Sequence, residues 1–214
     1  MYNKELLKES LLSEGGFLSD PLLDRFLEIG EIVVKKPKEY IIMPGITDKS
    51  IWVIATGFIK AFYFDGKKEI VLGFGGMGTI FLSPKSFSYG KPAFCGYRTI
   101  TESELLRINR KDFDLLMEES HEFAKWIFGV ATNQLGVLEV KTQLKSEKDI
   151  VASYKSLIKR QMQLGIGGMD MERKALLNIV SSKDIASYLG ITQSYLSNIR
   201  KAIIEEERNN NLKQ

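Results

Sequence analysis

The sequence predicts an α+β fold with an N-terminal antiparallel β-roll (a double-stranded β-helix), a long helix and a C-terminal helix-turn-helix domain. Short runs of Val, Ile, Phe and Tyr between turn residues fill positions 31–74. Apolar residues recur at helical spacing from Arg110 onward, and a glycine turn joins two short helices within 181–203. We expect three parts: a roll with short N-terminal helices (1–110), a helical linker with a dimerisation helix (111–145), and the helix-turn-helix domain (146–214).

Composition excludes several classes of protein. The chain has 214 residues, 44% of them hydrophobic and 27% charged, which is typical of a soluble globular protein. Its one cysteine, Cys95, excludes an internal disulfide and an iron–sulfur cluster, and its one histidine, His121, leaves little for a metal site or a catalytic triad. No signal peptide or apolar run of about 18 residues occurs. We therefore expect a cytoplasmic protein that is not an enzyme, carries no cofactor and has no membrane partner.

The first domain begins with a short helix and continues as strands. A helix over 21–29 is predicted because Asp20 offers an N-cap and proline follows at the first helical position. Turn residues (Lys-Pro-Lys, Pro-Gly, Thr-Gly and Asp-Gly) separate the runs that follow. The predicted strands lie within 31–36, 39–43, 51–64 and 69–74, with a last pair over 94–108. Many short strands without helices between them favour an antiparallel roll or barrel.

A long helix is predicted to end at Lys145 and Ser146, where a capping-box pattern begins. Apolar residues with one asparagine share a face of this helix, which is typical of a seam between two helices. The alternative is that this face packs on the chain's own roll. The candidate dimer seam consists of Trp126, Val130, Asn133, Val137 and Val140, and the stripe alone does not decide between a homodimer and packing on the roll.

The helix-turn-helix prediction rests on local signals. Ser181 and Asp184 form an acid-type capping box at the start of the first helix, Gly190 ends that helix, and Thr192 can cap the second. The second helix should turn its apolar residues, at spacings of three and four, into the core. An ordinary solvated helix pair is the alternative. The outward surface is predicted to bind DNA through Thr192, Gln193, Ser194, Tyr195, Ser197, Asn198, Arg200 and Lys201, since amide and guanidinium groups can pair with base edges.

Glycine-rich segments mark turns. GFGGMG at 73–78 matches a dinucleotide-binding pattern in letters, but no strand–helix–strand unit surrounds it, so a connection between strands is expected. LGIGGMD at 164–170 is predicted to be a loop, and the polar tail after Ile204 is expected to fray. No strand pair is predicted after the second helix, so we expect any wing to be absent or to lie elsewhere.

The order of these parts, with KDIASYLGITQSYLSNIRK near the C-terminus and EYIIMPGITDKSIWVIATGFIKAFYFDGKKEIVLGF in the roll, resembles the Crp/Fnr family of transcription regulators. The resemblance implies a cyclic nucleotide-binding-like roll, a long helix that pairs two subunits, and a second helix that enters the DNA major groove. It also implies an inverted-repeat operator on double-stranded DNA.

The roll departs from the cyclic-AMP binders of that family. Their Gly-Glu-Leu corresponds here to Gly78, Thr79 and Ile80, and their Arg-Ser or Arg-Thr pair to Ala93 and Phe94. Neither replacement can pair with a phosphate as arginine does. Arg98 lies five residues on, which reverses its face on a strand, so it can replace the missing arginine only through a bulge or a change of register. The effector-pocket candidates are therefore Gly78, Thr79, Ile80, Phe94 and Arg98.

These observations predict a homodimeric, sequence-specific DNA-binding regulator whose small-molecule effector, if it has one, is not cyclic AMP. One alternative is a cyclic-nucleotide-responsive regulator with an altered phosphate site. A second is a cupin-like metal-dependent enzyme, which the single histidine disfavours.

Overall fold

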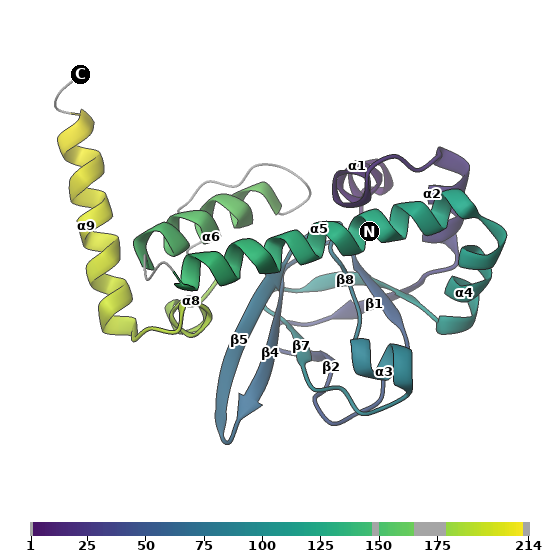
Figure 1. The fold of residues 1–214 in the computed structure, drawn as a ribbon, viewed down its shortest axis with the longest axis horizontal. Coiled ribbons are helices and arrows are strands. Elements are labelled where there is room, and N and C mark those ends of the chain that lie inside the picture. The colour runs from purple at the N-terminus through teal and green to yellow at the C-terminus, as the bar shows by residue number, and fades with distance from the viewer. Residues whose placement is uncertain (1, 147–149, 165–178, 212–214) are drawn as a thin grey trace.

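The computed structural model describes residues 2–146, 150–164 and 179–211. Its long helix α5 runs across a β-roll, with α1, α2 and α4 toward one end of that helix and α6, α8 and α9 toward the other (Figure 1). The helices are α1 (Lys4–Gly15), α2 (Asp20–Glu28), α3 (Pro84–Tyr89), α4 (Arg110–Glu119), α5 (His121–Ser146), α6 (Ile150–Leu164), α8 (Ser182–Leu189) and α9 (Gln193–Asn211).

Two antiparallel four-stranded sheets form the roll, as the sequence predicts. The strands are β1 (Glu31–Lys35), β2 (Tyr40–Ile42), β3 (Ile51–Ile54), β4 (Ile59–Asp65), β5 (Lys68–Gly75), β6 (Ile80–Phe81), β7 (Gly96–Thr99) and β8 (Ser103–Ile108). One sheet has the order β1-β8-β3-β6 and the other β2-β7-β4-β5, so β5 is an edge strand.

Alternation along the strands of the first sheet divides its apolar residues between two cores. Trp52, Ile54 and Leu105 lie in the cluster inside the roll, which includes residues of the second sheet. Val53 and Leu106 belong to a second cluster, which the first sheet shares with α1, α2, α4 and α5. The roll is thus filled within and covered by helices on one side.

Several element boundaries differ from the prediction. Ser19, not Asp20, is the N-cap of α2, so the helix begins one residue earlier than expected. The helical region after Arg110 is broken at Ser120, whose hydroxyl accepts a hydrogen bond from the Phe123 amide at 3.1 Å and starts a new helix.

Other parts of the chain also differ from the prediction. The two-residue strand β6 and the helix α3, which lie between β5 and β7, were not predicted. The tail expected to fray continues as helix to Asn211. The loop predicted over 164–170 lies, beyond Leu164, outside the described residues; no strand follows α9 within them.

Helix α1 packs on α5 at a point where two glycines meet. A Cβ atom on Gly129 would overlap the carbonyl oxygen of Gly15, and one on Gly15 would come within 2.5 Å of the Trp126 indole nitrogen. Glycine therefore allows the two helices to approach more closely than any other residue would. Nearby, the Asn133 amide donates to the Glu14 carboxylate at 2.9 Å and Ser10 Oγ donates to the Met77 carbonyl at 2.9 Å, which fixes α1 to both α5 and the roll.

We predict that Gly129→Ala lowers the free energy of unfolding by about 1–3 kcal/mol, because an added methyl group must push the two backbones apart. Gly136→Ala is the matched control in the same helix, since a Cβ there meets nothing within 4 Å. It should stabilise the protein by about 0.5–1 kcal/mol through the helix preference of alanine. Denaturant unfolding of both variants tests this; an equal effect of the two would contradict the close approach.

Candidate functional site

The helix pair predicted over 181–203 is present with its predicted caps. Ser181 Oγ accepts a hydrogen bond from the Asp184 amide at 3.1 Å, and Gly190 ends α8 in the left-handed region at φ 72°. Thr192 Oγ1 then accepts from the Tyr195 amide at 3.2 Å and caps α9. These contacts define a short turn between α8 and α9 with glycine at the one position that needs a positive φ.

One side of α9 is buried and the other is exposed. Leu196, Ile199 and Ile203 are at most 4% exposed and lie in one cluster with residues of α6 and α8, as predicted. Exposed side chains occupy the opposite side: Thr192, Gln193, Ser194, Tyr195, Ser197, Asn198 and Lys201. We call Gln193, Ser194, Ser197, Asn198 and Lys201 the reading face.

Arg200, predicted at the edge of this surface, is half-buried and binds neighbouring helices. Its Nε donates to the Tyr154 hydroxyl at 3.2 Å and its Nη1 to Ser182 Oγ at 2.8 Å, while the guanidinium carbon lies 5.8 Å from the Tyr154 ring centroid. Arg200 therefore connects α9 to α6 and α8 inside the domain. Its helical position is at the border of the two faces, and only the neighbouring helices decide which side it joins.

The candidate effector-pocket residues do not come together around one site. Gly78 is in a left-handed turn (φ 79°) against Ser10 of α1, and Ile80 is buried. Thr79 is half-buried. Phe94 is 58% exposed and stacks on Tyr63 with ring centroids 5.4 Å apart.

Aromatic side chains occupy the interior of the roll instead. Phe81 packs between Trp52 and Tyr97, with centroid distances of 6.5 Å and 4.6 Å. The Tyr97 hydroxyl donates to the Leu82 carbonyl at 3.0 Å, and burial raises the pKa of this phenol. The interior is therefore packed with large apolar groups that satisfy their own polar atoms.

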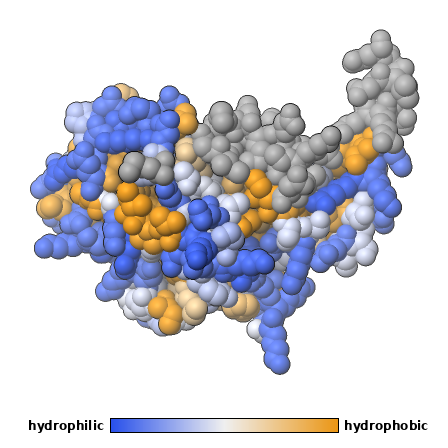
Figure 2. Space-filling view, turned by 180° about the vertical axis from the view of Figure 1, so that it is seen from behind, coloured by the Kyte–Doolittle hydropathy of each residue, from blue (hydrophilic) through white to orange (hydrophobic). Residues whose placement is uncertain are grey.

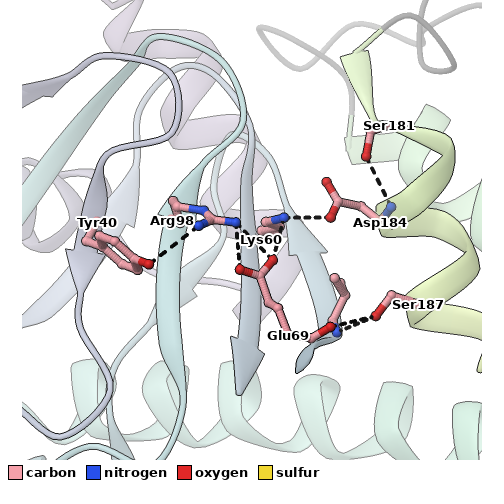
Figure 3. Close-up of polar contacts among 8 residues, drawn as sticks. Tyr40, Lys60, Glu69, Arg98, Ser181, Asp184 and Ser187 are labelled. Atoms are coloured by element: carbon pink, nitrogen blue, oxygen red, sulfur yellow. Dashed lines mark hydrogen bonds and ion pairs between the residues drawn. The ribbon is translucent and has the colours of Figure 1, made fainter. Parts of the chain in front are cut away.

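Arg98 points away from that interior, which corrects its assignment as a pocket candidate. Its strand position pairs with Lys60 on β4, so both side chains lie on the face of the sheet toward α8. Nη2 of Arg98 donates to both oxygens of Glu69, at 2.9 and 2.7 Å, and the guanidinium lies 5.4 Å from the Tyr40 ring centroid (Figure 3). The chain itself thus supplies a carboxylate partner for this arginine.

A polar network joins the same sheet face to α8 (Figure 3). Lys60 is 6% exposed, and its Nζ lies 2.8 Å from Glu69 and 2.6 Å from Asp184. Ser187 Oγ accepts from the Val71 amide at 3.0 Å and donates to the Glu69 carbonyl at 3.3 Å. Sequence reasoning missed this junction, although Lys60 stands out as the one charged residue in the apolar run 51–64.

The long helix buries the first residues of the predicted dimer seam in its own protomer. Trp126 and Val130 are 1% and 4% exposed and pack in the core with Phe26 and Phe123. Asn133 binds Glu14 of α1. Trp126 and Val130 are therefore covered within the protomer, as the alternative reading expected, whereas Asn133 is exposed; the side chains of Val137 and Val140 lie outside the described ones.

A different face of α5 carries exposed apolar residues. The charged surface of the molecule is interrupted by apolar patches (Figure 2), and among the large apolar side chains at the surface are Phe128, Leu135 and Leu138 of α5, which are 73%, 59% and 56% exposed. Their spacing of seven and three residues is that of a coiled-coil seam. We call these residues the α5 stripe.

Two other classes of site gain no support. In the described part of the chain, no group of three or more His, Cys, Asp or Glu side chains is placed to hold a metal ion. Burial raises the pKa of the Cys95 thiol, so it is not an activated thiolate. None of the described helices has the length and apolar character needed to cross a bilayer.

Comparison with known proteins agrees with this architecture. Residues 32–120 match the family model of the cyclic nucleotide-binding domain. Among solved structures, a CooA mutant from Carboxydothermus hydrogenoformans is similar with a TM-score of 0.65 and 16% identity over 92% of this chain and 83% of that one. FixK2 from Bradyrhizobium japonicum has a TM-score of 0.67 and 15% identity over 83% and 86% of the two chains.

The c-di-GMP responsive global regulator CLP of Xanthomonas campestris is also similar, with a TM-score of 0.65 and 16% identity over 88% of this chain and 93% of that one. The chain has the fold of the Crp/Fnr family regulators. The Crp/Fnr resemblance predicted from the sequence is thus confirmed for the fold. No curated protein sequence matches significantly.

Proposed function

We propose that this Crp/Fnr-like protein is a homodimeric, sequence-specific DNA-binding transcription regulator. The observation that carries the proposal is the reading face, where two amides, two hydroxyls and an ammonium group stand exposed on a helix whose other side is buried. Amide side chains pair bidentately with adenine, and lysine binds phosphate or guanine. The capped, glycine-linked pair of helices holds this face rigidly, as groove recognition requires.

The α5 stripe supports the proposed dimer. Three large apolar side chains exposed in one helical register favour a coiled-coil contact with a second copy, which would bury them. Each side chain that is fully buried contributes about 1.5–3 kcal/mol. A dimer on this stripe places two reading faces in one assembly, so the preferred operator is an inverted repeat.

For the effector, we propose that the roll does not bind cyclic nucleotides. Ala93 is buried and Phe94 is turned to the surface, so neither offers a guanidinium to a cyclic phosphate. Arg98, the one nearby arginine considered as a substitute, is bound to Glu69 on another face. A cyclic-nucleotide-responsive regulator remains the second candidate because residues 32–120 match that domain family.

Operator contacts should divide into two kinds. Gln193→Ala or Asn198→Ala should relax base preference by about 1–3 kcal/mol at one position in each half-site, since each amide contacts a base edge. Lys201→Ala should weaken all sequences alike and reduce the salt slope by about one, if the lysine contacts phosphate. Selection of binding sites followed by titration at several salt concentrations tests this, with exposed Lys67→Ala of the β4–β5 turn as the control. Equal loss of specificity in the three reading-face variants would contradict it.

Dimerisation should depend on the α5 stripe. The double change Leu135→Glu and Leu138→Glu should give monomers in sedimentation velocity, because four carboxylates would meet at the seam of the pair. Lys125→Glu is a control with the same change in net charge at an exposed position of α5 outside the stripe, and it should stay dimeric. If the stripe variant sediments as a dimer, the interface lies elsewhere on the protein.

Calorimetry with cyclic AMP and cyclic GMP should show no binding at micromolar concentrations. A buried cyclic phosphate without its arginine loses about 2–5 kcal/mol, or roughly 30-fold to several thousand-fold in affinity. A micromolar site would thus become millimolar. Micromolar binding by the wild-type protein would favour the second candidate.

A further inference from the structure

The junction between the roll and α8 is balanced in charge only when the two are together. Lys60 and Arg98 of the roll face a single roll carboxylate, Glu69, and Asp184 of α8 supplies the second. Lys60 is 6% exposed, so water cannot replace that carboxylate without the helix moving away. Asp184 therefore gives α8 an electrostatic partner at one defined point of the sheet.

Ser187 fixes α8 along the edge of the sheet. Its hydroxyl accepts from the amide of Val71 and donates to the carbonyl of Glu69, two free backbone groups of the edge strand β5. Asp184 and Ser187 are three residues apart and therefore lie on the same face of α8. A rotation of α8, or a slide along β5, would break both sets of contacts.

The rest of the junction is apolar and less directional. Phe58 of the roll is fully buried in one cluster with Ile185 and Leu189 of α8, and Phe74 packs on Tyr188 with centroids 5.7 Å apart. Such contacts hold the surfaces together but tolerate small displacements. The polar contacts are directional, so they define where α8 sits on β5.

The position of α8 determines that of the reading face, because the Gly190 turn and the shared core join α9 to α8. We propose that Lys60, Asp184 and Ser187 are positioning residues that set the half-site spacing accepted by the dimer. This inference rests on the proposed function: two reading faces must lie about 34–36 Å apart to enter successive major grooves. The junction ties each reading face to its roll and hence to α5, which carries the proposed dimer seam.

The test compares affinity for inverted repeats that differ only in the length of the spacer. Wild-type protein should prefer one spacer by at least about tenfold over spacers two base pairs longer or shorter, since two base pairs rotate a half-site by about 70°. Asp184→Asn, Lys60→Gln and Ser187→Ala should reduce that preference to less than about threefold. Their affinity for a single half-site should remain within about twofold of wild type, because the reading face is intact.

Lys60→Gln is the central variant because it leaves the sequence of α8 and its capping box unchanged. Lys68→Gln is its matched control: an exposed lysine of β5, on the same hairpin, whose loss should leave the spacer profile unaltered. Hydrogen exchange of the Val71 amide gives a readout without DNA; it should be faster by at least about tenfold in Lys60→Gln and unchanged in Lys68→Gln.

The outcomes separate this inference from the proposed function. A wild type that binds no inverted repeat at any spacing would overturn the proposed function and this inference with it. A wild type that shares one spacer profile with Lys60→Gln and Asp184→Asn would overturn only the inference, whether or not the Val71 amide exchanges faster. Broadened profiles with wild-type half-site affinity would support it.

Discussion

Lys60 carries a charge at a place where the fold admits almost no water. A buried ammonium group is costly unless opposite charges and hydrogen bonds surround it, and removing one partner of such a group typically costs about 3–5 kcal/mol. Here the partners come from two parts of the chain: Glu69 from the adjacent strand and Asp184 from the C-terminal helix pair. Because Glu69 also binds Arg98, the roll alone leaves one positive charge in excess. The C-terminal domain is therefore part of the electrostatic environment in which this face of the roll is stable.

The contact of α1 with α5 and the contact of α8 with the roll use opposite chemistry. In the first of these, α1 approaches so closely that glycine is needed on both helices, and the contact surrounds an aromatic core of Phe26, Phe123 and Trp126. The contact of α8 with the roll is instead organised by an ion pair and by a serine on the edge of a sheet. The α1 contact is fixed by the shapes of closely packed groups, whereas the α8 contact is fixed by charge and by hydrogen-bond direction. The fold thus positions its helices in two different ways.

The parts of the fold that the sequence predicted are those determined by neighbouring residues. A cap such as Ser181 with Asp184, or a left-handed glycine such as Gly190, depends on a few consecutive positions, and these were confirmed. Helical spacing placed Trp126 and Val130 on one face but did not say what covers it, and α1 and α2 cover it rather than a second subunit. Lys60 and Asp184 are 124 positions apart, so no local sequence pattern predicts their contact. The two-residue strand β6 is too short to give a period.

The same limit applies to the candidate sites. The exposed side of α9 followed from the periodicity of the helix itself. Arg200, however, lies at the border of two faces, and its hydrogen bonds to Tyr154 and Ser182 turn it towards the neighbouring helices. Arg98 was a pocket candidate because it lies close to Ala93 and Phe94 along the chain, and it lies on the opposite face from Tyr97, as strand alternation predicted. The position of a residue along a strand or helix predicts which face its side chain lies on. It does not predict which other residue the side chain contacts there, because that residue belongs to another part of the chain.

The α5 stripe has a consequence for how such a protein responds to its own abundance. Among the described side chains of α5, the exposed apolar residues of the stripe span 128–138, between one and two heptads. In the dimer proposed on this stripe, pairing depends on protomer concentration, and the concentration of dimer rises with the square of protomer concentration while pairing is sparse. Occupancy of a two-fold site would follow that square. A modest change in synthesis or degradation of the chain would act as a signal in its own right, with no small molecule involved.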